Sequence, residues 1–507
     1  MRKQVITAAE AAAMVKNGST VATSGFVGTA FPEELAVAIE ERFEKFGEPK
    51  GLTLVYAAGQ GDAKNRGVNH FGHEGLVSRV IGGHWGLVPK LQKLALENKI
   101  EAYNIPQGVV SHLFRDIAAK KPGMITHIGL NTFVDPRLEG GKLNEVTTKD
   151  IVELIEIHGK EYLIYPTFPI DVALVRGTTS DTNGNITMEK EALTAEALSC
   201  AQAARNSGGI VLVQVERVVD TGTLDPKQVV IPGIFVDAVI VASDPKYHMQ
   251  TFSVNFNPEY IGMKSNEKQE AVVLSAERRI ISMRAAKELI PGAVINLGIG
   301  MPEGVAQVAE KGSYTITVEA GPIGGTPAGG LDFGCSSNPE AIIDQPYEFD
   351  FYQGGGLDLA YLGLAQGDEN GNVNVSKFGT RIAGCGGFID ITQTAKKVVY
   401  CGTFTAKGLK ISCRDGKLVI DREGTIKKFI KNVQQITFSG AYAMEKGQSV
   451  LYVTERAVFK LTTNGMVLTE IAPGIDLEKD VLSQMAFKPI ISEDLTLMDA
   501  SLFLPGK

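Results

Sequence analysis

The stretch Tyr314-Thr-Ile-Thr-Val-Glu-Ala-Gly-Pro-Ile-Gly-Gly325 places one carboxylate, Glu319, between a β-branched run and a glycine-rich turn. The residues from Thr315 to Val318 favour an extended strand, and the glycines and proline that follow Ala320 end it. We therefore expect Glu319 at the carboxyl end of a buried strand, where open α/β sheets bind their ligands. A glutamate that only caps the strand, or that starts the next helix, is the alternative interpretation.

Strand and helix patterns alternate on both sides of this stretch, which is typical of a largely parallel α/β sheet. The order of patterns in the first half of the chain returns in the second half. Three pairs of segments match in that order: Pro32-Glu-Glu-Leu-Ala36 with Pro302-Glu-Gly-Val-Ala306, Thr53-Leu-Val-Tyr-Ala-Ala-Gly59 with Thr315-Ile-Thr-Val-Glu-Ala-Gly321, and Asp181-Thr-Asn-Gly-Asn-Ile186 with Asp368-Glu-Asn-Gly-Asn-Val373. The Asn-Gly dipeptides of the last pair predict a β-hairpin in each half.

The repeat predicts two related open α/β domains that arose by internal duplication. At 507 residues the chain is also too long for a single core. The region between the halves, which includes Asp244-Pro-Lys-Tyr-His248, is polar and interrupted by prolines, as linkers are. We expect an N-terminal domain at 1–243, a linker at 244–274 and a C-terminal domain at 275–507 that carries Glu319.

The duplication makes Glu319 informative. The matching position in the first half is Ala57, although the residues around it are similar in kind. A structural cap would suit both halves equally, whereas a catalytic group is needed once per site. The comparison therefore favours a functional role for Glu319.

Composition excludes several classes of function. The formal net charge is −8, so the chain as a whole does not attract nucleic acid or a membrane surface. The five cysteines are scattered without a CxxC motif, which is typical of reduced thiols in the cytoplasm. The N-terminal residues resemble a polar, alanine-rich helix rather than a secretory signal, and we expect no transmembrane helix.

Two further candidates stay open from the residues alone. The spacing of His70 and His73 would allow a metal site, but no cysteine or acidic pair completes it in the sequence. We therefore expect loop or interface histidines and no metal. Gln107, in Tyr103-Asn-Ile-Pro-Gln-Gly108, is either a turn residue or a hydrogen-bond donor to a substrate carboxylate.

The glycine loops around Glu319 admit more than one chemistry. A nicotinamide-dependent dehydrogenase would need a dinucleotide motif, and Gly298-x-Gly300-x-x-x-Gly304 has the third glycine displaced by one position and Pro302 inside it. A single carboxylate among backbone N–H donors suits covalent catalysis better, because a carboxylate can attack an activated acyl group and form an anhydride. The N–H groups would then stabilise the oxyanion.

The ordered set of these motifs resembles the family I CoA-transferases, most closely the acetate/propionate (short-chain acyl-CoA:acetate/3-ketoacid) CoA-transferases. The resemblance runs nearly end to end. The segments that carry it are Gly298-Ile-Gly-Met-Pro302, Glu319-Ala-Gly-Pro-Ile-Gly-Gly325, Gly354-Gly-Gly-Leu-Asp358, Gly384-Cys-Gly-Gly-Phe-Ile-Asp390, Gly82-Gly-His-Trp85 and Tyr103-Asn-Ile-Pro-Gln-Gly108. Succinyl-CoA:3-ketoacid transferases follow the glutamate with Asn-Gly, where this chain has Ala320-Gly321. That departure argues against a strict 3-ketoacid enzyme and leaves the acceptor open.

The resemblance implies a CoA-transferase-like fold and a ping-pong reaction. Glu319 would form first an acyl-glutamyl anhydride and then a glutamyl-CoA thioester. Coenzyme A would be a substrate, with no tightly bound cofactor and no metal. The family also implies a homo-oligomer, with a tetramer as one possibility, that acts in the cytoplasm on acyl-CoA and short-chain carboxylates.

The resemblance also implies roles for other residues, in a site between the two halves. Gly298 and Gly300 would line the CoA pocket, Gly386 and Gly387 would supply oxyanion N–H groups, and Gln107 would bind the acyl carboxylate. The alternatives are an acyl-CoA thioester hydrolase of the same fold, which would use water as the acceptor, and a non-catalytic CoA or metabolite sensor. The intact glutamate with its glycine loops argues against the sensor.

Overall fold

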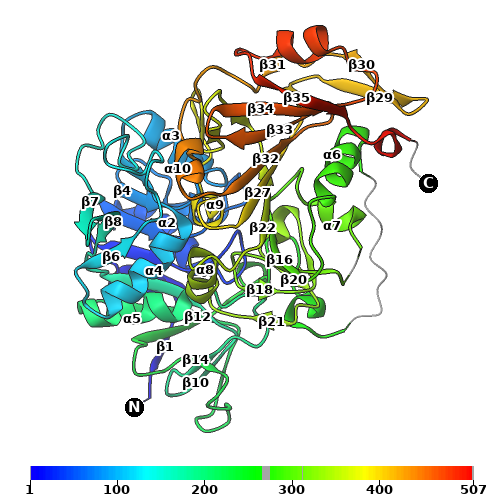
Figure 1. Ribbon diagram of the computed structural model, residues 1–507. Helices are drawn as coiled ribbons and strands as arrows, with labels where there is room; N and C mark the ends of the chain where they lie inside the picture. Colours follow the sequence, from blue (N-terminus) through cyan, green and yellow to red (C-terminus); the bar gives the residue numbers. More distant parts are fainter. Residues whose placement is uncertain (1, 265–273, 311, 505–507) are drawn as a thin grey trace. The chain divides into compact units, whose positions relative to one another are not determined.

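The computed structural model describes residues 2–264, 274–310 and 312–504 (Figure 1). The chain forms two compact units that alternate along the sequence. Unit 1 comprises Met1–Ser265, Val318–Asp350 and Thr380–Asp390, and unit 2 comprises Asn266–Thr317, Phe351–Gly379 and Ile391–Lys507. Glu319 therefore clusters with most of the first half. Of the predicted linker at 244–274, residues 265–273 lie outside the described part of the chain, and 244–264 belong to unit 1.

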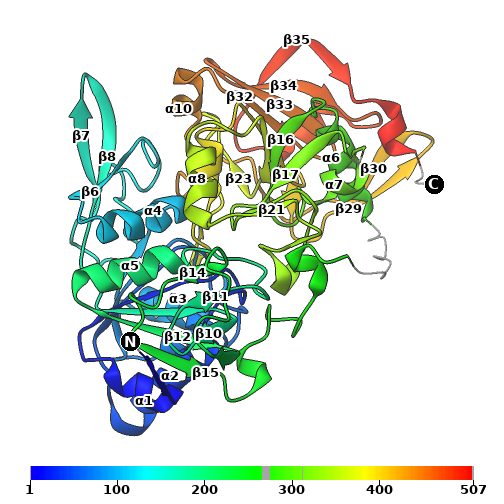
Figure 2. The same ribbon diagram turned by 90° about the horizontal axis from the view of Figure 1, so that it is seen from below.

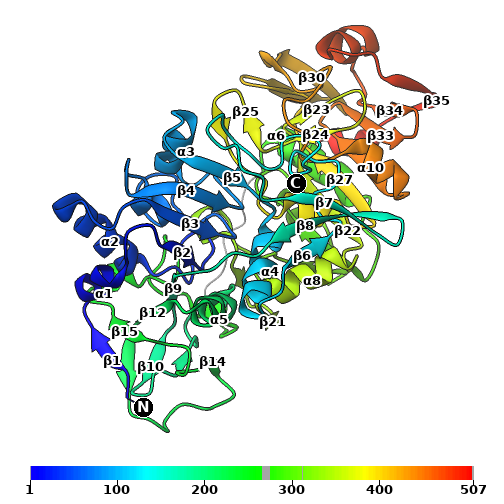
Figure 3. The ribbon, with the colours of Figure 1, turned by 90° about the vertical axis from the view of Figure 1, so that its left-hand side faces the viewer.

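A parallel sheet forms the centre of unit 1, and Figure 3 shows four of its strands, β2 to β5, side by side. Its strands are short and rich in buried Val, Leu, Ile and Ala, as expected of a sheet covered on both faces. The strands lie in the order β1 (Gln4–Ile6), β15 (Ala238–Val241), β12 (Ile210–Val215), β9 (Val172–Arg176), β2 (Thr20–Thr23), β3 (Leu52–Tyr56), β4 (Val77–Gly82) and β5 (Glu101–Asn104).

Helices cover both faces of this sheet. Alternate strand residues, such as Leu54 and Leu174, form one core with three helices, which are α1 (Ala8–Met14), α2 (Glu33–Phe46) and α3 (Pro89–Leu96). The opposite face carries α4 (Gln107–Ala118) and α5 (Ala197–Ser207), which pack against each other (Figure 2). The two-residue period of a strand explains how one sheet supplies both cores.

Local signals fix where the first helices begin and end. Thr7 and Glu10 form a capping box at the start of α1, in which each side chain accepts a hydrogen bond from the other residue's backbone N–H. Gly47 ends α2 in the left-handed conformation that glycine adopts without strain. These local signals set where α1 begins and where α2 ends.

Unit 2 has its own sheet, which is parallel at one side and mixed at the other. Five neighbouring strands, β17, β16, β22, β27 and β32, pair in parallel. Next to them, β33 pairs antiparallel with both its neighbours, and β35 pairs parallel with β34. They lie in the order β17 (Tyr314–Thr317), β16 (Ala293–Leu297), β22 (Leu359–Gly363), β27 (Lys397–Cys401), β32 (Ser449–Val453), β33 (Ala457–Thr462), β34 (Gly465–Ile471) and β35 (Ile490–Leu497). The helix α6 (Ala276–Ala286) packs on α7 (Gly304–Val308) and contributes Ile280 and Ile281 to the core of this unit.

The two predicted hairpins are present, and their hydrogen bonds are the same. The strands β10 (Thr179–Asp181) and β11 (Ile186–Thr187) pair antiparallel, as do β23 (Gln366–Gly367) and β24 (Val373–Asn374). Asp181 Oδ1 accepts from the N–H groups of Asn183 and Asn185, both at 2.9 Å. Asp368 Oδ1 accepts from Asn370 and Asn372 at 3.1 and 3.0 Å. The α/β fold class is confirmed, and the matched hairpins support the duplication.

Among the described residues, no helix combines the length and the apolar composition needed to span a membrane.

Candidate active site

Glu319 lies two residues beyond the end of β17, in a tight bend. Val318 N–H donates to Pro322 O and Gly321 N–H donates to Val318 O, both at 2.9 Å. Gly321 has φ +125°, and a Cβ on it would lie 2.0 Å from Ile343 O, so the bend requires glycine here. Glu319 is 9 % exposed. The sequence therefore predicted the environment of this carboxylate correctly, at the carboxyl end of a strand.

Two of the predicted glycines adjoin the glutamate. A Cβ on Gly387 would lie 3.5 Å from Glu319 Cγ and 3.3 Å from Phe349 Cζ, so the backbone of Gly387 packs directly on the side chain of Glu319. Gly386 precedes it with φ +53°, and its N–H donates to Gly83 O at 2.8 Å. Because that N–H already has a partner, Gly386 contributes a close backbone approach, and Gly387 is the better candidate for an oxyanion donor.

Gln107 is the first residue of α4, rather than a residue of a turn. Its backbone N–H donates to Gly386 O at 2.9 Å, and a Cβ on Gly386 would lie 3.7 Å from Gln107 Oε1. The next residue, Gly108, donates its N–H to Asp390 Oδ2 at 3.1 Å. The start of α4 is thereby tied to the glycine loop, and unit 1 brings together Glu319, Gly386, Gly387 and Gln107.

The amide of Gln107 continues into a buried chain of polar groups that the sequence did not reveal. Gln107 Nε2 donates to Gln345 Oε1 at 3.2 Å, and Gln345 Nε2 donates to Glu196 Oε2 at 3.1 Å. Burial raises the pKa of Glu196 to about 8, against the lowering effect of nearby backbone N–H groups. These residues come from segments far apart in the chain, so spacing gives no signal of the contact.

His84 is a further residue of this site for which the sequence assigned no role. It is the histidine of the Gly82-Gly-His-Trp85 motif, and a Cβ on Gly386 would lie 3.6 Å from its Cδ2. Burial, with the charge of Arg381, lowers the pKa of His84 to about 4, so the imidazole is neutral at physiological pH. Its Nδ1 is buried and has no hydrogen-bond partner among the described residues. The motif itself was the available signal.

Gly298 and Gly300 belong to unit 2 and follow β16. Gly298 N–H donates to Tyr361 O at 2.8 Å, Gly300 has φ +83°, and Arg278 Nη2 donates to Gly300 O. Arg278 also pairs with Glu303 at 2.7 Å, which stiffens this loop. That the loop lines the CoA pocket stays a prediction.

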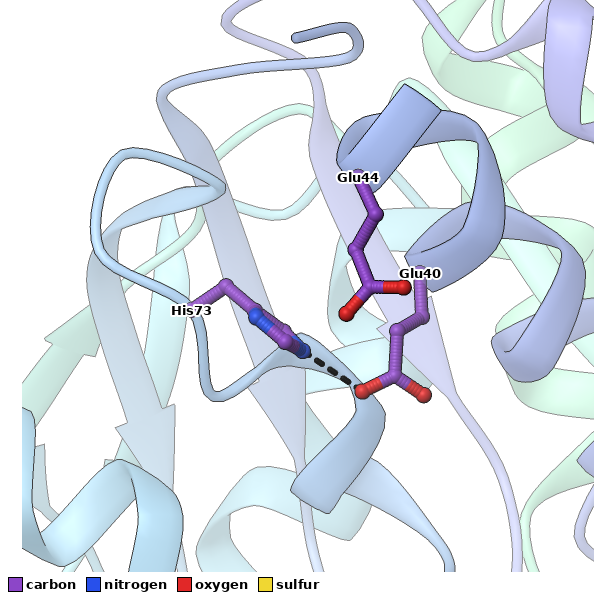
Figure 4. Close-up of side chains that lie close together, drawn as sticks. All are labelled: Glu40, Glu44 and His73. Atoms are coloured by element: carbon purple, nitrogen blue, oxygen red, sulfur yellow. Dashed lines mark hydrogen bonds and ion pairs between the residues drawn. The ribbon is translucent and has the colours of Figure 1, made fainter. Parts of the chain in front are cut away.

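His70 and His73 do have acidic neighbours, which α2 supplies. Figure 4 shows Glu40 and Glu44 on this helix facing His73, and His73 Nε2 lies 2.5 Å from Glu40 Oε1. His70 contacts Glu40 through Nδ1 and Glu33 through Nε2, the latter at 3.0 Å. Although burial opposes it, the hydrogen bonds from both histidines lower the pKa of Glu40 to about 2.

Glu40, Glu44 and His73 together offer three possible metal-ligand atoms within 4.8 Å of one another. Glu40 already contacts three cationic or polar partners, His70, His73 and Lys90. The arrangement is therefore best described as an ion-pair cluster that joins α2 to the following loop. The sequence-based expectation missed the acidic side chains because they lie on α2, before β3, whereas the histidines follow β3.

A cavity of about 280 Å³ in unit 1 lies beside Arg176, Glu191 and His248. None of the predicted site residues lines it. The predicted site residues therefore lie outside this cavity.

Comparison with known sequences agrees with the geometry. The family model described as Coenzyme A transferase matches residues 5–242. A caffeate CoA-transferase of Acetobacterium woodii is 50% identical over 98% of this chain and 97% of its own length. An acetate CoA-transferase, YdiF, of Escherichia coli (strain K12) is 44% identical over 99% of this chain and 96% of its own length.

Comparison with solved structures gives the same result. The acyl-CoA transferase YdiF of E. coli O157:H7, in a thioester complex with CoA, superimposes with a TM-score of 0.93 at 44% identity. The match covers 99% of this chain and 96% of that chain. The apoenzyme of the same protein also gives a TM-score of 0.93.

Proposed function

Since the chain belongs to the coenzyme A transferase family and is a CoA-transferase, we propose that it moves CoA between a short-chain acyl-CoA and a carboxylate such as acetate. The observation that carries the proposal is the packing of Gly387 against the buried Glu319, with Gln107 tied to the same glycine loop. The acetate CoA-transferase among the relatives supports the acceptor class, and the caffeate enzyme indicates that the family also accepts larger acids.

The proposed reaction begins with attack by Glu319. A carboxylate oxygen of Glu319 bonds to the thioester carbonyl carbon, the C–S bond breaks, and CoA leaves as the thiolate. The thiolate then attacks the glutamyl carbonyl carbon of the resulting anhydride, and the bond between that carbon and the bridging oxygen breaks. The acyl group departs as a carboxylate and leaves a glutamyl-CoA thioester. A second carboxylate reverses the two steps, so atoms and charges balance over the cycle.

The residues around Glu319 supply binding and electrostatic stabilisation. The N–H of Gly387 would stabilise the oxyanion, and the loss of one such donor costs roughly 10²–10³-fold in rate. Gln107 would hydrogen-bond the acid substrate. Gly386 would allow the substrate to approach the backbone, and Gly298 and Gly300 would line the CoA pocket. Burial of Glu319 supports the proposal because an anhydride must be kept from water.

The remaining features of the proposal concern the whole protein. The N-terminal (1–243) and C-terminal (275–507) halves are proposed to be copies of one ancestral α/β domain, joined by residues 244–274. The matched hairpins support this origin. A cytoplasmic location is supported by the five cysteines, which are all unpaired. A homo-oligomer is supported by the family resemblance.

The test uses the purified chain with propionyl-CoA, followed by intact-mass measurement and by CoA release with and without acetate. We expect a covalent CoA adduct on Glu319, rapid CoA exchange only when a carboxylate is present, and no adduct on Glu319→Ala. CoA release that does not depend on acetate would identify a thioester hydrolase instead. The absence of an adduct with acyl-CoA donors of several chain lengths would contradict the mechanism.

A further inference from the structure

Gln107, Gln345 and Glu196 form a buried series of hydrogen bonds in which every donor points the same way along the series. Gln107, Gln345 and Glu196 are 2 %, 0 % and 1 % exposed. Each amide uses its nitrogen to donate to the next member, from Gln107 to Gln345 and from Gln345 to Glu196. The carboxyl oxygen of Glu196 therefore terminates the chain as an acceptor.

The ordinary structural role of Glu196 would be to cap α5, and the structure does not support that role. Glu196 occupies the N-cap position, yet its side chain makes no capping hydrogen bond to the helix. The preceding residue, Ala195, has φ +48°, an unfavourable conformation for a residue other than glycine. This conformation lets Ala195 O accept from Gln345 N–H at 3.0 Å, and Thr194 Oγ1 donates to Asp344 Oδ1 at 2.6 Å. Two further contacts thus join the segments that carry Gln345 and Glu196.

The two ends of a glutamine amide are nearly equal in size and opposite in hydrogen-bonding role. Gln345 alone could present either end to Gln107. In the structure Glu196 Oε2 accepts from Gln345 Nε2, so Gln345 Oε1 faces Gln107 and accepts from Gln107 Nε2. One N–H of Gln107 and its Oε1 then remain for the site beside Gly386. Reversal of either amide would place two donors or two acceptors against each other in a buried position.

We infer that Glu196 and Gln345 are positioning residues, which fix the end of the Gln107 amide that meets the acid substrate. The inference rests on the substrate-binding role proposed for Gln107. Glu196 does not contact the reacting atoms and acts only through Gln345. Its value to the enzyme is preorganisation, since a fixed amide need not be ordered when the substrate binds.

The test substitutes the terminal acceptor. Glu196→Met keeps the length of the side chain and removes the acceptor, whereas Glu196→Gln keeps an oxygen that can accept from Gln345. We expect Glu196→Met to raise the KM for the carboxylate roughly five- to tenfold, about the effect of one hydrogen bond. We expect kcat to change less, and Glu196→Gln to restore most of the KM. The adduct on Glu319 should still form in both variants.

A double-mutant cycle separates positioning from a general structural effect. In a Gln107→Met background, Glu196→Met should change the KM no further, because the group that it positions is gone. Asp181→Asn is the matched control, since Asp181 is a buried carboxylate of unit 1 outside this chain of contacts. It should lower the melting temperature and leave the KM unchanged.

Each outcome bears on a different claim. Multiplicative effects of Glu196→Met and Gln107→Met, or an unchanged or lower KM in Glu196→Met, would overturn the inference while leaving the mechanism intact. Failure of the wild-type chain to form an adduct would instead contradict the proposed function itself.

Discussion

The segments Thr53–Gly59 and Thr315–Gly321 match in sequence pattern, and the first has Ala57 where the second has Glu319. In the first, the strand β3 leads to Ala57, which is fully buried; a Cβ on Gly83 would lie 2.0 Å from Ala57 O. In the second, the strand leads to Glu319, and Gly387 packs on its side chain at a distance that leaves room for it. The two stretches end in different turns: Gly321 has φ +125° and its N–H donates to Val318 O, whereas Gly59 O accepts from Val27 N–H. Of these two matched positions, only the second carries a carboxylate.

Placing a glutamate at the matching position of the first half is the strongest test of the difference between the two segments. Ala57→Glu places an unpaired charge in a position with no space or partner for it. We expect a loss of about 3–5 kcal/mol in the free energy of unfolding and no second active centre. Denaturant unfolding followed by the fluorescence of Trp85, the single tryptophan, measures the change in unit 1. Ala57→Val is the size control, with a smaller loss. A stable Ala57→Glu variant would show that the two turns are more alike than their packing indicates.

Shortening the acid in its native position sharpens the comparison. Glu319→Asp retains the charge and withdraws the carboxylate by one methylene, which spoils the attack geometry. We expect CoA transfer to fall by roughly 10²–10³-fold with little change in the unfolding midpoint. Steady-state exchange between acetyl-CoA and labelled acetate measures it. Near-normal transfer would mean that the carboxylate is not held in one position.

The starts of α2 and α7, which follow β2 and β16, are anchored by different ion pairs, and the pH dependence of stability distinguishes them. In the first half, Glu33 pairs with His70, and in the second Glu303 pairs with Arg278. Burial tends to lower the pKa of His70, but Glu33 and Glu40 raise it from 6.5 to about 9. A raised histidine pKa stabilises the fold fully below pH 6.5, and this contribution is lost as the pH rises through about 9.

We therefore expect the stability of unit 1 to fall by on the order of 2–3 kcal/mol between pH 6.5 and 9.5. His70→Gln should flatten that dependence, and Trp85 fluorescence in urea at several pH values measures it. Arg278→Gln removes an ion pair that involves no histidine, so it should lower stability by the same amount at each pH. Parallel pH profiles for the wild type and His70→Gln would contradict the assignment of this contribution to His70.

The sequence predicted the parts of the molecule that depend on short-range patterns. The hairpins followed from Asn-Gly, and Glu319 followed from a strand pattern together with the absence of an acid at Ala57. Gln107 stayed ambiguous between a turn residue and a hydrogen-bond donor to a substrate carboxylate. The structure places it at the start of α4, with its N–H bonded to Gly386 O, and its contact with a substrate stays a prediction.

Other features depend on contacts between distant segments, which periodicity does not encode. The pairing of Gln345 with Glu196, and the occupation of the Gly386 N–H by Gly83, are of this kind. The acidic neighbours of His70 and His73 left a partial signal in the sequence. Glu33, Glu40 and Glu44 recur at spacings of seven and four, which places them on one face of a helix. That periodicity was a signal of a shared neighbour, although it does not name the histidines.

The bend after Glu319 also decides where this enzyme can be engineered. A side chain at Gly321 would collide with the backbone at Ile343, so random libraries at that codon would return mostly unfolded clones. Its neighbour Ala320 is fully buried in an apolar cluster that includes Phe26 and Phe252. A larger apolar residue at Ala320 would therefore need a smaller neighbour, such as a substitution at Phe252, to be accommodated.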